Sequence, residues 1–132
     1  MRVANWPQVL FDEIAAWRAK EFEWGRTDCC QFVRRVTEVI SGKDYGAQFP
    51  AYESEFGAAR LIAEYGGLEQ LLCAAFGESR PALLAQRGDV VLCDFGRGPQ
   101  PSICLGAVCV APAEAGGLES RPLASALASW KI

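Results

Sequence analysis

Histidine is absent from the 132-residue sequence. Its imidazole is the side chain that most readily exchanges a proton near neutral pH, and it is also the commonest metal ligand. The absence excludes any Cys–His or Ser–His dyad and every zinc site that uses imidazole. A catalytic function in this chain would therefore need a proton carrier of another kind.

Clustered positive charge is also lacking. The chain has 13 Lys and Arg against 16 Asp and Glu, with no basic run. Phosphate binding requires such clusters, so no nucleic acid is expected as a partner. No apolar run approaches the roughly 20 residues of a membrane span, and Met1–Pro7 lacks the apolar core of a signal peptide. We expect a chain that is made in the cytoplasm and has no membrane span.

The residues that are present fit one folded domain over 1–132, since 51% of the chain is apolar and 22% is charged. The six cysteines are expected to be reduced thiols that pack as small apolar side chains. A metal site is not expected, because no Cys-x-x-Cys pair occurs and Cys104 and Cys109 would face opposite sides of one strand. No cofactor is predicted.

Helical patterns fill the first half of the sequence. One amphipathic pattern predicts a helix over 7–21 that buries Leu10, Ile14 and Trp17. Asp28 is a good N-cap, and Gln31 three residues later completes a capping-box pair. The helix that follows ends at Gly42, and its expected buried face consists of Cys29, Phe32, Val33, Val36, Val39 and Ile40.

The later elements complete the predicted fold class. Two more helices are expected over 54–65 and 68–77, after a loop over 43–53. The remaining predicted elements are a strand over 90–95, a connection over 96–101, a central strand over 102–110, an edge strand over 118–123 and a helical turn over 124–129. Helices followed by strands indicate an α+β fold, with a small antiparallel sheet packed against the helices.

The stretch Trp24–Phe32 carries the candidate chemistry. A turn containing Gly25 delivers Cys29 to the first turn of a helix, where unpaired N–H groups and the helix dipole favour a thiolate. The neighbouring carboxylate of Asp28 disfavours it. The favoured interpretation of Cys29 is a small apolar residue buried at a helix start, because free cysteine is among the most buried residue types.

Three motifs, Phe22–Cys29, Arg87–Val91 and Cys104–Ala107, follow one another along the chain. Their order resembles the NlpC-type cell-wall peptidases, papain-like enzymes that also occur as phage tail proteins. The first motif is similar to the family's Trp-Gly-x-x-Asp-Cys, the second to its Gly-Asp-Val, and the third lies where the family has His-Val-Gly-Ile. Residues 52–67 and the end of the chain resemble a phage tail-assembly branch of that fold.

The resemblance implies a papain-like fold with Cys29 at the nucleophile position. The family's histidine falls on Cys104, which is not expected to act as a base, or on Ser102 if the strand is slipped by two residues. No third residue of a catalytic triad can be placed. Carboxylates that could reach the site from the sheet are Asp94, Glu114 and Glu119.

Three functions remain open. The resemblance and the missing histidine favour a non-catalytic domain that is a structural or assembly component of a phage or prophage tail. It would be made in the host cytoplasm and built into the virion, with other tail-tip or hub proteins as partners of the loops over 43–53 and 96–101. The alternative is a cysteine peptidase or amidase that acts on peptidoglycan through Cys29 with an unusual base. The third is thiol redox chemistry through a disulfide between Cys29 and Cys104.

The aromatic residues near these motifs have two interpretations. They could line a sugar-binding groove inherited from a peptidoglycan enzyme. Core packing is favoured, because aromatic side chains dominate the energetics of protein cores. The residues concerned are Trp17, Phe22, Trp24, Phe32, Phe95 and Trp130.

Overall fold

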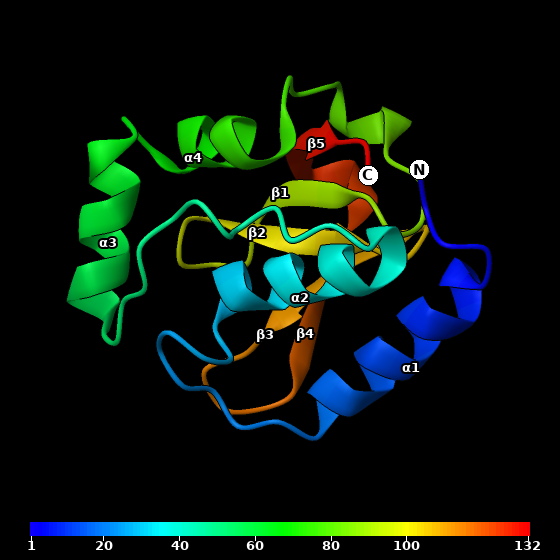
Figure 1. Cartoon of the computed structure of the whole chain (residues 1–132), viewed down its shortest axis with the longest axis horizontal. Coiled ribbons are helices and arrows are strands. Elements are labelled where there is room, and N and C mark those ends of the chain that lie inside the picture. Colours follow the sequence, from blue (N-terminus) through cyan, green and yellow to red (C-terminus); the bar gives the residue numbers. More distant parts are fainter.

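Helices come first along the chain and strands second in the computed structural model, which describes residues 1–132 (Figure 1). The helices are α1 (Trp6–Arg18), α2 (Cys29–Ser41), α3 (Glu55–Glu64) and α4 (Leu68–Phe76). The strands are β1 (Val90–Asp94), β2 (Pro99–Cys104), β3 (Val108–Pro112), β4 (Leu118–Pro122) and β5 (Ala126–Trp130), with 3₁₀ helices η1 (Ala82–Leu84) and η2 (Leu123–Ser125). The predicted α+β order is confirmed.

The local sequence signals act most clearly at the ends of α2. Asp28 caps its start, since the carboxylate accepts a hydrogen bond from the backbone N–H of Gln31 at 3.0 Å. Gly42 ends the helix in the left-handed region, at a φ of 77°. The buried face consists of Phe32, Val33, Val36, Thr37 and Ile40. Cys29 and Val39, which are predicted on this face, are only half-buried.

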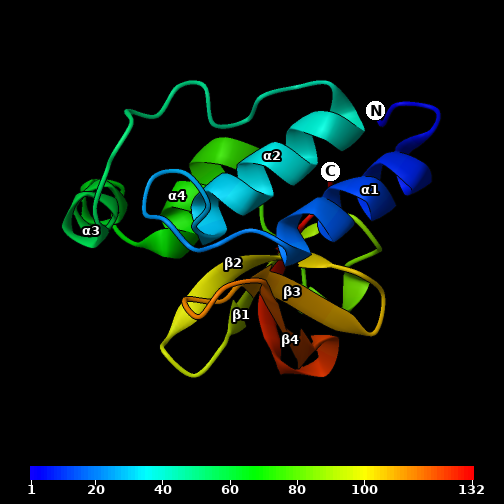
Figure 2. The same cartoon turned by 90° about the horizontal axis from the view of Figure 1, so that it is seen from below.

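Five antiparallel strands form one sheet in the order β4-β3-β2-β1-β5. Helices α1, α2 and α4 lie over one face of this sheet, and α3 lies to one side, near α4 (Figures 1 and 2). The predicted edge strand is confirmed as β4, which has Pro122 at its end. Charged residues and proline on an edge strand discourage pairing with other chains.

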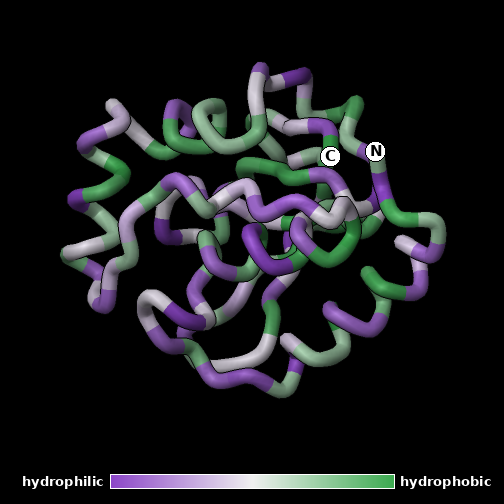
Figure 3. Tube along the Cα trace, in the orientation of Figure 1, coloured by the Kyte–Doolittle hydropathy of each residue, from purple (hydrophilic) through white to green (hydrophobic).

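Two apolar clusters cover the two faces of the sheet. The larger contains 14 buried residues from helices and strands, including Trp17, Phe32 and Trp130. The smaller lies on the face away from these helices, and its members are Val91, Cys93, Phe95, Cys104, Cys109 and Ala111. Alternate residues of a strand point to opposite faces, and β1 serves both clusters. Its residues from Val90 to Cys93 are therefore all apolar, as the green of β1 shows in Figure 3.

The prediction of one central strand over 102–110 is wrong. The chain turns after Cys104, with Gly106 at a φ of 108° and a hydrogen bond from the N–H of Leu105 to the carbonyl of Val108 at 2.8 Å. The turn makes Cys104 and Cys109 cross-strand partners, and both belong to the smaller cluster. They therefore share one face of the sheet, contrary to the prediction.

The predicted helical turn over 124–129 is also largely wrong. Only η2 is helical there, and the chain continues as β5, which pairs with β1 through partners such as Val90 and Trp130. The predicted connection over 96–101 is shorter than expected because β2 already begins at Pro99. Two prolines fit in β2 because its first half pairs only with β1, whereas β3 pairs with the last two residues of β2.

Candidate functional site around Cys29

The carboxylate of Asp28 fixes the turn that carries Cys29. It is only 1% exposed and accepts hydrogen bonds from the backbone N–H groups of Gly25 at 2.7 Å and Gln31 at 3.0 Å. The hydroxyl of Tyr52 donates to the same carboxylate, with a distance of 2.8 Å to each oxygen. These donors come from the α1–α2 loop, the start of α2 and the α2–α3 loop, so one buried carboxylate joins all three segments.

Gly25 and Tyr52 also touch through their backbones. Gly25 has a φ of 82°, and a Cβ atom at this position would collide with the carbonyl oxygen of Tyr52. Burial raises the pKa of Tyr52 far above its ordinary value, and the negative charge of Asp28 acts in the same direction. The phenol therefore stays protonated and keeps its role as a donor to Asp28.

A cleft with a cavity of about 220 Å³ lies over Cys29. Phe22 and Trp24 form part of its wall as an edge-to-face pair, with ring centroids 5.0 Å apart. They are half-buried, so these two aromatic residues differ from the four that pack in the core as predicted. Tyr52 and α3 form further parts of the wall. The β1–β2 turn and the β3–β4 turn also contribute to it.

Strand β2 presents Pro99, Gln100 and Pro101 to this cleft. Cys104 and Ser102, the two residues predicted at the histidine position, do not line it. Cys104 belongs to the cluster on the far face of the sheet, and the hydroxyl of Ser102 donates to the carbonyl of Val91 at 2.8 Å. The prediction that Cys29 and Cys104 face each other as a possible disulfide is therefore wrong.

One of the three carboxylates expected near the site, Glu114, lines the cleft. Asp94 instead accepts hydrogen bonds from the N–H groups of Gly96 and Gly98 in the β1–β2 turn, and Glu119 pairs with Arg97 at 2.8 Å. Glu55 at the start of α3 also lines the cleft and was not predicted. Glu55 and Glu114 are exposed and make no ion pair.

The arrangement supplies a thiol and a cleft without an obvious proton carrier. A general acid that protonates a leaving amine contributes about 10²–10⁴-fold to amide hydrolysis. The carboxylates of Glu55 and Glu114 that line the cleft are both exposed to solvent. The adjoining Cys29 thiol and burial raise the pKa of Cys30 well above its ordinary value, so this second thiol stays protonated.

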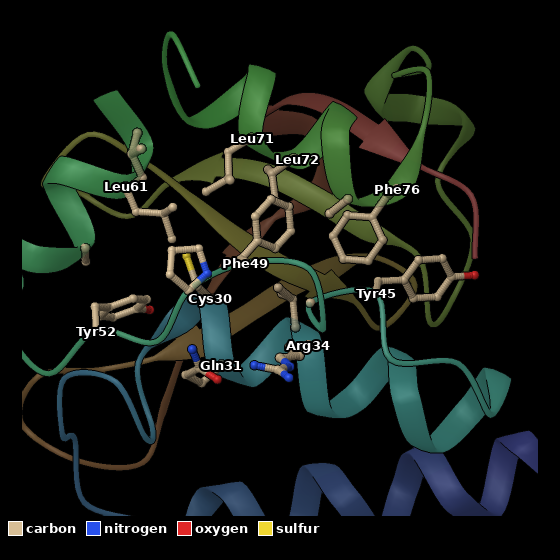
Figure 4. A pocket seen from close by; sticks show the side chains of 16 residues that line it. Cys30, Gln31, Arg34, Tyr45, Phe49, Tyr52, Leu61, Leu71, Leu72 and Phe76 are labelled. Atoms are coloured by element: carbon tan, nitrogen blue, oxygen red, sulfur yellow. The ribbon is translucent and has the colours of Figure 1, made fainter. Parts of the chain in front are cut away.

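A second pocket, of about 60 Å³ and mainly apolar, adjoins the cleft (Figure 4). Phe49 from the α2–α3 loop points toward Leu72 of α4 in this pocket. Arg34 binds the carboxylate of Asp44 through two hydrogen bonds of 2.8 Å and lowers the pKa of that group. The loop over 43–53 is therefore fastened to α2 by an ion pair and packed on α4 by aromatic and aliphatic side chains.

Sequence reasoning identified Cys29, Asp28 and Glu114 but missed the partners across the cleft. Tyr52 lies in an irregular loop, and no short-range pattern indicates that its hydroxyl reaches Asp28. The prolines of β2 carried a usable signal, since proline is tolerated only where a strand lacks a neighbour on one side. That signal locates an open end of β2, which is where the cleft lies.

No group of three or more Cys, Asp or Glu side chains is arranged to hold a metal ion. None of the helices combines the length and the apolar character needed to cross a membrane.

Comparison with known proteins adds one match. The model of a family described as "Domain of unknown function (DUF6950)" matches residues 1–132. No curated protein matches the chain. The match covers every element that lines the cleft, from the α1–α2 loop to the β3–β4 turn.

Proposed function

The chain belongs to the family described as a domain of unknown function (DUF6950), and from the geometry of its cleft we propose a non-catalytic papain-like domain. It serves as a structural or assembly component of a phage or prophage tail. It is made in the host cytoplasm and is then incorporated into the tail with other tail-tip or hub proteins.

One observation carries the non-catalytic part of the proposal. The strand that faces Cys29 across the cleft offers Pro99, Gln100 and Pro101, and none of these side chains can take up and return a proton at neutral pH. With no histidine in the chain, no imidazole is present to activate the thiol or to protonate the leaving amine.

The tail-assembly part is supported by the resemblance of residues 52–67 and of the chain end to a phage tail-assembly branch. Within the first segment, Tyr52 holds the turn before Cys29 and α3 forms one side of the cleft. The resemblance therefore includes residues that shape the cleft. An assembly protein needs such a surface but needs no proton carrier.

Incubation of the purified protein with peptidoglycan, beside a Cys29→Ala variant, tests the absence of catalysis. We expect no release of soluble wall fragments from either protein. Release by the wild type that is lost in Cys29→Ala would refute the proposal and establish a peptidase or amidase.

A genetic comparison tests the assembly role. In the phage or prophage that encodes this chain, a stop codon in its gene is expected to yield particles without complete tails under the electron microscope. The Cys29→Ala allele is expected to give normal tails. Complete tails despite the stop codon would refute the assembly role.

A further inference from the structure

We infer, on the basis of the non-catalytic function proposed above, that the cleft over Cys29 binds an extended segment of a partner protein by accepting one lysine side chain. The cleft size, its apolar wall and its unpaired charges each bear on this choice of ligand.

The size of the cavity favours a single side chain over a saccharide. Pockets for small molecules and cofactors usually measure about 300–1,000 Å³. The cavity over Cys29 has about 220 Å³. It is therefore below the range in which a disaccharide of the cell wall would be enclosed, and large enough for one long side chain.

The wall of the cleft suits the aliphatic part of a lysine. Phe22, Trp24 and Tyr52 line the cleft, and Pro99 and Pro101 line it too. Long cationic side chains bury their methylene stem against apolar surface and keep the ammonium group at a polar end. An ammonium group near the face of a tryptophan gains a further cation–π attraction.

The charges of the cleft select a cation. Glu55 and Glu114 line it without an ion-pair partner, whereas its only basic residue, Arg97, already pairs with Glu119 at 2.8 Å. The carboxylate of Asp28 beneath them accepts hydrogen bonds but contacts no cation. Unneutralised negative charge repels acidic segments and attracts basic ones, and this attraction weakens as salt increases.

Short acetylated and amidated peptides that differ only at a central residue test the inference. The central residue is lysine, norleucine or glutamate, and binding to the full chain is measured by calorimetry and by the fluorescence of the tryptophans. We expect the lysine peptide to bind at least about tenfold more tightly than the norleucine peptide, with the affinity falling as salt rises. The glutamate peptide is expected not to bind.

Matched variants assign the binding to the cleft. The double variant Glu55→Gln, Glu114→Gln is expected to lose the preference for lysine over norleucine, with an unchanged melting temperature. Glu78→Gln removes an exposed, unpaired carboxylate outside the cleft and is expected to keep that preference. Equal binding of the lysine and norleucine peptides, or no binding of the lysine peptide at millimolar concentration, would overturn the inference.

Free lysine amide serves as the control for an isolated cation. We expect it to bind more weakly than the peptide, and equal affinity would overturn the assignment to a partner segment. If the peptides do not bind and the peptidoglycan is not hydrolysed, only this docking role is refuted. Hydrolysis that depends on Cys29 would refute the non-catalytic function whatever the peptides do.

Discussion

Three cysteines of the smaller cluster differ from Cys29 in what surrounds their sulfur atoms. Cys93, Cys104 and Cys109 are fully buried, and loss of water raises the pKa of each thiol. For Cys109, burial and the nearby Cys104 and Cys93 raise the pKa to about 12 from its ordinary 9.0. Cys29 lines an open cleft instead. The same residue type is therefore buried in the smaller cluster but accessible from the cleft at Cys29.

The raised pKa of Cys109 predicts a loss of stability at high pH. Between pH 9.0 and about 12, the unfolded chain releases a thiol proton that the folded chain retains. The free energy of unfolding therefore decreases as pH rises through this window, by no more than about 1.4 kcal/mol per pH unit for one thiol. Urea unfolding of the wild type and of Cys109→Ser across the window measures the effect. We expect a smaller slope in the variant, and equal slopes would contradict the prediction.

At the scale of elements, two loops meet at Gly25 and determine where α2 begins. The α1–α2 loop passes so close to the α2–α3 loop that only glycine fits beside the carbonyl of Tyr52. The same α1–α2 loop reaches the β3–β4 turn, where the N–H of Gly117 donates to the carbonyl of Lys20 at 3.0 Å. These contacts bring the aromatic pair Phe22 and Trp24, the start of α2 and the side chain of Glu114 together around one cleft.

Two glycine substitutions distinguish the cost of backbone strain from the cost of breaking this contact between loops. Gly42 and Gly25 have similar φ values of 77° and 82°, but a Cβ atom at Gly42 would meet nothing within 4 Å. Gly42→Ala is expected to lower the free energy of unfolding by about 1–2 kcal/mol, the cost of a left-handed alanine. Gly25→Ala is expected to cost at least about 1 kcal/mol more, because the loops must separate.

Chemical denaturation of both glycine variants measures this difference. The tryptophan fluorescence of folded Gly25→Ala should also change, because Trp24 lies in the displaced loop. Equal destabilisation by the two substitutions would show that the loops part without cost.

On the scale of the whole molecule, one buried ion pair ties both ends of the chain to the sheet. The guanidinium of Arg2 donates to the carboxylate of Asp89 at 2.9 Å and to the carbonyl of Ile132 at 3.1 Å. Asp89 also accepts from the backbone N–H groups of Gln86 at 2.9 Å and Ile132 at 3.1 Å. The Gly-Asp-Val motif thus has a structural role at the point where the two ends of the chain meet (Figure 1).

Removal of this guanidinium is expected to destabilise the fold. Arg2→Met should lower the free energy of unfolding by about 1.5–3 kcal/mol, the range for hydrogen bonds to charged groups. Arg60→Met, which breaks a surface pair of 4.0 Å with Glu64, should change it by less than about 0.5 kcal/mol. Thermal and urea unfolding compare the two. An Arg2→Met variant as stable as Arg60→Met would show that the backbone hydrogen bonds of Asp89 suffice.

Local chemistry in the sequence determined the helices and the start of the site. Asp28 and Gly42 mark the ends of α2 because a cap and a left-handed residue act on neighbouring backbone groups. The edge strand β4 and the absence of an imidazole could be recognised in the same way. Each of these conclusions depends on residues close together in the chain or on composition.

Tertiary structure alone decided what Cys29 faces. The resemblance puts Cys104 at the position opposite the thiol, whereas Cys104 lies on the far side of the sheet. An apolar run gives no period from which the faces of β2 and β3 can be assigned. The hydroxyl of Tyr52, the prolines of β2 and the carboxylates of the cleft reach Cys29 from distant segments. These groups come together because of how the loops pack and where the strands turn. Long-range contacts determine both, and local sequence patterns do not predict such contacts.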